Sequence, residues 1–260
     1  PSLLIDSAGG GAGQRATRLA VVNDDMPFLV DSIAGTITAR GLTIGRLLHP
    51  VLSFERDRRG RVTGIAAADG HARESVIYLE FDRVGARDRG SLPDEILAVL
   101  ADVRAAVEDW ARMKTALRDA AERIAEREGS ALIQWFAQGN LTILGHRLEA
   151  RDGTASEGLG ILRGSEPAVW NDDTRAAAFA WFERGGGEPL LAKADLIATV
   201  HRRAPIDLVV TARREAGKVV ALDITAGLWT SAALAARPDT VPVLRSHLAA
   251  LDIEHGFDAS

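Results

Sequence analysis

The sequence predicts an α+β protein: an antiparallel sheet with two helices on one face, followed by a second antiparallel α+β module. Residues 18–110 follow the order strand, helix, two or three strands, helix. Residues 206–213 and 219–226 are two apolar runs joined by a turn-forming stretch, which is the pattern of a hairpin. The length of 260 residues favours two domains, because single cores stop growing beyond about 250 residues.

Composition excludes several classes of protein. With 47% hydrophobic and 26% charged residues the chain is neither disordered nor fibrous, and a net charge of -5 provides no broad positive field for nucleic acid or an anionic membrane. The absence of cysteine excludes disulfides and thiolate sites and makes the cytoplasm the expected compartment. No apolar run has the length of a membrane helix, and the start lacks an export signal. Because Pro1 stands where a native start has Met, we expect a piece of a longer protein.

Four regions are expected along the chain. Residues 1–17 are predicted to be flexible, because the glycine-rich stretch 8–14 is followed directly by a strand pattern and so lacks the context of a dinucleotide-binding fingerprint. A first α+β domain at 18–111, a helical connector at 112–138 and a second α+β module at 139–260 follow. In the first domain we expect strands at 18–22, 42–54, 61–67 and 76–81, and helices at 28–41 and from the capping sequence 91–94 to Trp110.

The second module has its own predicted elements. The connector is expected to be helical with a weak break at 129–130. Beyond it, strands are predicted at 141–149, 159–162 and 190–202, helices at 176–182 and 241–251, and the hairpin described above between them.

One short segment combines charge, backbone donors and a helix start. Its carboxylates and amide are suited to an amino group, and the free N–H groups at the helix start are suited to an α-carboxylate. Two alternatives remain open, namely that the aspartates only cap the helix and that the segment contacts another domain. The candidate ligand-binding residues are Asn23, Asp24, Asp25, Met26, Pro27, Phe28 and His49.

A second polar cluster is predicted on the strand at 190–202. Alternation would place Lys193, His201 and Arg203 on one face, with Arg202 beside them, and so form an interdomain docking edge or a solvated strand face. No histidine has the helical spacing of a metal ligand, so we expect no metal. Thr230 or Ser231 is expected to cap a helix, because Trp229 and Ala233 replace the glycines that a nucleophile elbow needs. Most of the five tryptophans are expected to pack in cores rather than to serve as stacking platforms.

Several motifs resemble one family in the same order. They are Asn23-Asp-Asp-Met-Pro-Phe-Leu-Val-Asp-Ser32, His49-Pro-Val51, Arg73-Glu-Ser75, Leu144-Gly-His-Arg147, Thr199-Val-His-Arg202, Gly227-Leu-Trp-Thr-Ser-Ala-Ala233 and Val241-Pro-Val-Leu-Arg245. Together they resemble the amino-terminal regulatory region of the large NAD-specific glutamate dehydrogenases of bacteria, which opens with an ACT domain. A standard ACT domain is a βαββαβ unit. Here the chain stays helical after the second helix, so either a strand such as 3–6 fills the edge or the domain is a variant. Phe28 stands where many ACT domains have glycine.

The resemblance implies a noncatalytic regulatory or assembly region. The parent would oxidise L-glutamate with NAD to 2-oxoglutarate and ammonium, whereas this chain would bind no cofactor. Implied partners are the catalytic region, other protomers of a homo-oligomer and an amino-acid effector. A purely structural oligomerisation module is the alternative, and a small enzyme is a third reading that no cluster of acid, base and nucleophile supports.

Overall fold

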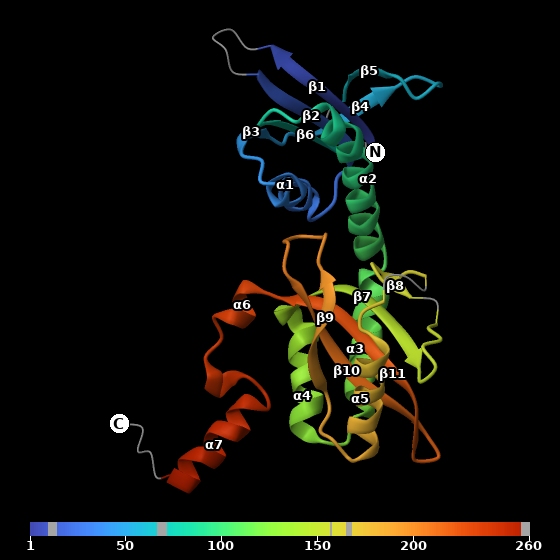
Figure 1. Cartoon of the computed structure of the whole chain (residues 1–260), viewed down its shortest axis with the longest axis vertical. Helices are drawn as coiled ribbons and strands as arrows, with labels where there is room; N and C mark the ends of the chain where they lie inside the picture. Colours follow the sequence, from blue (N-terminus) through green and yellow to red (C-terminus); the bar gives the residue numbers. More distant parts are fainter. Residues whose placement is uncertain (10–14, 67–71, 157, 165–167, 256–260) are drawn as a thin grey trace. The chain divides into compact units, whose positions relative to one another are not determined.

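The computed structural model describes residues 1–9, 15–66, 72–156, 158–164 and 168–255. Contacts divide the chain into two units, Pro1–Val107 with Thr199–Arg203, and Glu108–Ala198 with Ala204–Ser260. Both units are α+β with antiparallel sheets, as predicted (Figure 1). None of the described helices is long and apolar enough to cross a membrane.

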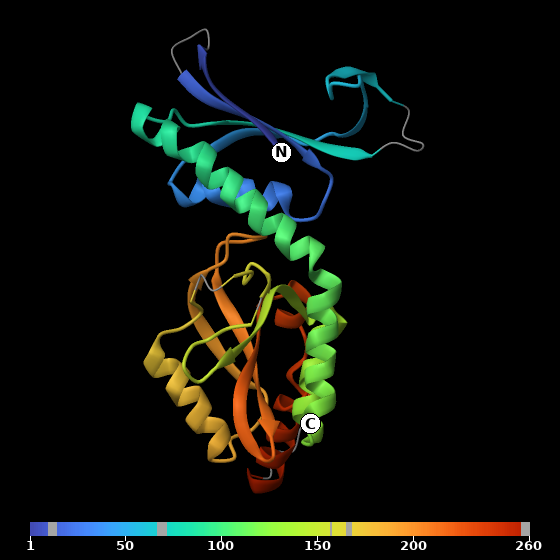
Figure 2. The same cartoon turned by 90° about the vertical axis from the view of Figure 1, so that its right-hand side faces the viewer.

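The first unit contains one six-stranded sheet, ordered β1-β2-β6-β4-β5, with β3 also paired to β6. Figure 2 shows α1 and α2 on the same face of this sheet. This confirms the ACT-like arrangement of strands with two helices on one side. Its elements are β1 (Ser2–Gly9), β2 (Arg15–Asp24), α1 (Leu29–Ala39), β3 (Ile44–Leu48), β4 (Val51–Arg56), β5 (Val62–Ile65), β6 (Arg73–Phe81) and α2 (Ala86–Glu108).

Alternation along the central strands positions the first core. Leu19, Ile77 and Leu79 are fully buried, and their sequence neighbours Ala20 and Tyr78 point to the opposite face of the sheet. Two apolar helix stripes cover the inward residues, with Ile33 on α1 and Ile96 on α2 also fully buried. In the described part of this unit, the other face of the sheet therefore carries no helix.

Two expectations for the first unit were wrong. Residues 2–9 form β1, which pairs with β2 from Ser2↔Val22 to Gly9↔Arg15, so the prediction of a flexible start was wrong here, whereas the alternative of a strand such as 3–6 at the sheet edge is confirmed. The rest of the glycine-rich stretch, residues 10–14, lies outside the described residues. Helix α2 begins at Ala86, so Ser91 and Asp94 do not cap it and Pro93 lies inside it. The Ser91 hydroxyl instead donates to the Asp88 carbonyl.

The second unit contains a five-stranded antiparallel sheet, ordered β8-β7-β11-β10-β9. On one face Asp223 of β11 pairs with Arg123 of α3, and on the other Glu149 of β7 accepts a hydrogen bond from Trp170 and pairs with Arg175 of α5. Figure 2 shows α3 and α5 on opposite sides of this sheet. Its elements are α3 (Trp110–Arg123), α4 (Arg127–Trp135), a π-turn (Phe136–Asn140), β7 (Leu141–Ala150), β8 (Leu159–Gly160), α5 (Asp172–Glu183), β9 (Leu190–Ile197), β10 (Pro205–Glu215), β11 (Lys218–Trp229), α6 (Ser231–Leu234), a 3-10 turn (Pro238–Thr240) and α7 (Leu244–His255).

Helices α3 and α4 belong to the second core. Met113, Leu117 and Ile133 are buried in one cluster with strand residues such as Ile143 and Val209, so the stretch 112–138 does more than connect. The helical break lies at 124–126, not at 129–130. Its cause is local: the Glu126 carboxylate accepts the N–H groups of Glu128 and Gly129 and caps α4.

Boundaries of three smaller elements also differ from prediction. Helix α5 starts earlier than predicted, because the Asn171 side chain accepts from the Thr174 N–H and caps it. Strand β9 ends at Ile197 rather than Arg202, and β8 ends at Gly160. Thr230 caps α6 by accepting from the Ala233 N–H, which confirms the predicted Thr or Ser cap.

Glu128 connects the start of α7 to α4. Its carboxylate accepts hydrogen bonds from Arg245 Nε at 2.9 Å and from the Val243 N–H at 3.0 Å. These donors, Arg245 first, lower the pKa of Glu128 from 4.5 to about 2. The stability that this carboxylate contributes is therefore complete above pH 4.5 and is lost as the pH falls toward 2.

Replacing Glu128 tests this contact. We expect Glu128→Gln to lower the free energy of unfolding near neutral pH and to flatten its dependence on pH between 4.5 and 2, because the variant has no carboxylate to protonate. Urea denaturation at a series of pH values measures both effects. Equal slopes for the two proteins in that window would contradict the assignment.

Candidate functional site

The turn between β2 and α1 is held by partners from α2 and β6. Arg104 Nη2 donates to Asn23 Oδ1 at 3.1 Å and to Asp24 Oδ2 at 2.8 Å, so one guanidinium spans both side chains. No side chain in the described part of the chain caps α1. The aspartates are therefore not helix caps, and the capping alternative is wrong for this turn.

Ser75 connects the turn to the bend between β3 and β4. Its hydroxyl donates to Asp25 Oδ1 at 2.8 Å and lies 2.9 Å from His49 Nε2. Because a hydroxyl has one proton, His49 is the donor in the second bond. Asp25 also lies 3.6 Å from the Arg73 guanidinium. The structure thus brings two predicted site residues, Asp25 and His49, together through a serine that is fully buried.

Phe28 is the residue directly before α1, and its backbone is left-handed, at φ 71°. Glycine adopts this conformation at little cost, which explains why glycine would suit the position; a phenylalanine there is strained. Its ring contacts the ring of His201, with centroids 5.3 Å apart, and His201 has a left-handed backbone as well, at φ 69°. Met26 is half-buried and Pro27 is exposed beside it.

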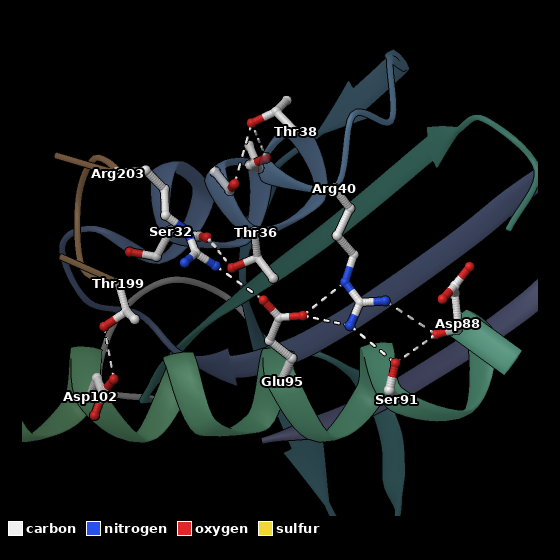
Figure 3. A network of polar contacts seen from close by, with 12 residues as sticks. Ser32, Thr36, Thr38, Arg40, Asp88, Ser91, Glu95, Asp102, Thr199 and Arg203 are labelled. Atoms are coloured by element: carbon white, nitrogen blue, oxygen red, sulfur yellow. Dashed lines mark hydrogen bonds and ion pairs between the residues drawn. The ribbon is translucent and has the colours of Figure 1, made fainter. Parts of the chain in front are cut away.

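Residues Thr199–Arg203 belong to the first unit by their contacts. The His201 N–H donates to the buried Ser32 hydroxyl at 2.9 Å, and Thr199 Oγ1 donates to Asp102 Oδ2 at 2.8 Å. Burial raises the pKa of Asp102, and the Thr199 hydrogen bond partly opposes that shift. Arg203 donates to Glu95 Oε1 at 3.0 Å, while Arg40 Nε binds the other oxygen of Glu95 at 2.8 Å (Figure 3).

A shallow cavity of about 530 Å³ lies along α1 beside these contacts. Both signs of charge border it. Asp31 has a side chain that is 61% exposed and lies 3.3 Å from His201 Nδ1, and the arginines of the loop contribute the positive charge. The lining residues are Asp31, Ala34, Gly35, Thr38, Ala39, His201, Arg202 and Arg203.

Lys193 lies apart from this cluster. It is on β9 in the second unit, where its Nζ bonds Asp207 of the neighbouring strand, whereas His201, Arg202 and Arg203 follow the end of that strand. The predicted shared strand face is therefore wrong, because the chain leaves the sheet after Ile197. Among the described residues no group of three or more candidate metal ligands converges.

Sequence reasoning missed Ser75 and Arg104. Ser75 carried a usable signal, because extending the alternation of Ile77, Leu79 and Phe81 back by two residues places a serine on the buried face. Arg104 carried no such sequence signal, because its partner Asp24 lies about 80 residues earlier in the chain.

Comparison with known proteins agrees with the fold. Residues 6–96 match the family model described as glutamate dehydrogenase, ACT1 domain. The chain is 29% identical to an NAD-specific glutamate dehydrogenase of Halomonas elongata and 28% identical to one of Pseudomonas aeruginosa, with 93% of this chain aligned in each case. It spans only 17% and 16% of those relatives. The resemblance of the sequence motifs to this ACT-containing region of the large dehydrogenases is thereby confirmed.

Removing the Ser75 hydroxyl tests the geometry of the turn. We expect Ser75→Ala to lower the free energy of unfolding by about 1–3 kcal/mol, because Asp25 and His49 each lose a hydrogen-bond partner at a buried position. Urea denaturation measures the change. Ser53→Ala on the adjacent strand β4, also buried, is the matched control and should cost less. Equal losses in the two variants would contradict a bridging role for Ser75.

Proposed function

We propose that this chain is a noncatalytic regulatory region of an NAD-dependent glutamate dehydrogenase. The match of residues 6–96 to the ACT1 domain and the alignment over 93% of the chain support this. The parent enzyme converts L-glutamate, NAD and water into 2-oxoglutarate, ammonium and NADH, and binds NAD outside this chain. Its catalytic region and other protomers are the expected partners, and the cytoplasm is the expected compartment.

An α-amino acid is the proposed effector. The geometry favours a position at Asp31 in α1, shortly after the turn between β2 and α1. Asp24 and Asp25 already have internal cationic or hydroxyl partners, so an incoming ammonium group would have to compete with Arg104 and Ser75. Asp31 is more available, because its contact with His201 Nδ1, at 3.3 Å, is longer than the 2.8 Å contact of Asp24 with Arg104.

The cavity on α1 fits both ends of a zwitterion. Asp31 binds the ammonium group, and the guanidinium groups of Arg202 and of Arg203, which also contacts Glu95, attract the carboxylate. Small residues of α1, among them Ala34 and Gly35, also line the cavity. The observation that carries this proposal is therefore the cavity on α1, which has both positive and negative side chains. The carboxylates of the neighbouring turn, Asp24 and Asp25, are already bonded to Arg104 and Ser75.

Titration of the chain with the twenty common amino acids tests the proposal. We expect at least one to raise the melting temperature, because a ligand at about 100 times its Kd stabilises the folded state by about 2.7 kcal/mol. Asp31→Asn should abolish the response, whereas the matched variant Asp24→Asn should retain it. Calorimetry provides the affinity in each case.

Two other outcomes would decide against this position or this function. Loss of the response in Asp24→Asn but not in Asp31→Asn would place the effector at the turn between β2 and α1. No response to any amino acid would favour the alternative, a purely structural assembly module.

A further inference from the structure

The outer face of the first sheet, which α1 and α2 leave uncovered, has an ordered pattern of side chains. Strand register places one residue of each strand in the same row, and the order of strands across the face is β1, β2, β6, β3. The central row is apolar: Leu4, Ala20, Tyr78 and Leu48. Leu4 is 66% exposed and Leu48 is 54% exposed.

The next row along the strands is charged and alternates in sign. In the same strand order it consists of Asp6, Arg18, Glu80 and Arg46. Glu80 lies 3.6 Å from Arg18 and 3.5 Å from Arg46, so the row holds its charges in place through contacts within the sheet. Both arginines remain accessible, with side chains 46% and 62% exposed.

When the order of this charged row is reversed in a second copy, each residue faces one of opposite charge. A two-fold axis parallel to the strands, passing between β2 and β6, reverses the order of strands in the facing copy. Arg18 of one copy then faces Glu80 of the other, and Asp6 faces Arg46. In the apolar row the same rotation sets Leu4 against Leu48 and the small Ala20 against the large Tyr78, while Val22 faces Val76 in the row beyond.

We propose that this outer sheet face is the interface with a second copy of the chain, formed by face-to-face packing of the two first-unit sheets. Sheets pack in this manner with their strand directions within about 30° of each other, which preserves the correspondence of the central rows. The apolar row is removed from water in the dimer, and the charged row fixes the register and excludes partners of other charge pattern. The interface does not involve the cavity on α1, so dimerisation and the amino-acid response are separate measurements.

Reversing the charge of single residues tests the interface, because the variants' effect on dimerisation can be measured separately from their effect on folding. In Arg18→Glu, each introduced glutamate would face Glu80 of the other copy, and in Glu80→Arg each introduced arginine would face Arg18. Each variant alone should therefore dimerise at least about tenfold more weakly than the unmodified chain, because like charges face each other across the interface. Sedimentation velocity over a range of concentrations measures this, and thermal melting checks that each variant folds.

Mixing the two variants is the decisive step. In the mixed dimer the introduced glutamate of one chain faces the introduced arginine of the other, and the remaining Glu80 faces the remaining Arg18. Opposite charges are thus restored at both places, and dimers should reappear. Arg237→Glu in the second unit, where the side chain is 80% exposed, is the control and should leave dimerisation unchanged.

Three results would overturn the proposal. The first is an unmodified chain that stays monomeric at the highest concentration that sedimentation can follow. The second is dimerisation of the single variants as tight as that of the unmodified chain, and the third is a mixture of the two variants that stays monomeric.

Discussion

The hydrogen bonds of Arg104 to Asn23 and Asp24 hold the turn from which α1 begins. They connect the end of β2 to α2, and Ser75 connects the next residue, Asp25, to His49. With the turn held at both places, Phe28 is kept in a left-handed backbone that a phenylalanine would otherwise avoid. That conformation starts α1 at Leu29 and presents the Phe28 ring to His201.

The distribution of charge follows from these contacts. Two partly buried carboxylates of α2 have donors from other elements: Glu95 accepts from Arg40 and Arg203, and Asp102 accepts from Thr199 (Figure 3). Such pairing is needed because an unpaired charge is costly to bury. Asp31 differs, since its carboxylate is mostly exposed at the edge of the α1 cavity. We therefore infer separate roles for the two sides of the first unit. The cavity on α1 binds an effector, and the outer sheet face binds a second copy of the chain.

Much of the fold could be predicted from local pattern, and the failures have a common physical origin. The hairpin of β10 and β11 and the alternation of β6 depend on neighbouring residues, so their sequences specify them. The sequence left a strand at residues 3–6 as one of two alternatives for the sheet edge, because this short run becomes ordered only by pairing with β2. The end of β9 was misplaced because Thr199–Arg203 finds its partners on α1 and α2, far away in sequence. The candidate turn was located from its composition, but its partner Arg104 was not, since long-range contacts leave no periodic signal.

Backbone amide hydrogen exchange, followed residue by residue with and without a saturating amino acid, tests the central claim most directly. If the α1 cavity binds the effector, protection should rise at the start of α1 and at His201–Arg203, because a bound ligand suppresses local opening of the segments that contact it. The amides of β10 and β11, in the core of the second unit, should be unaffected. Protection that appears only in the second unit, or at the β2–α1 turn without any change at His201–Arg203, would contradict the account.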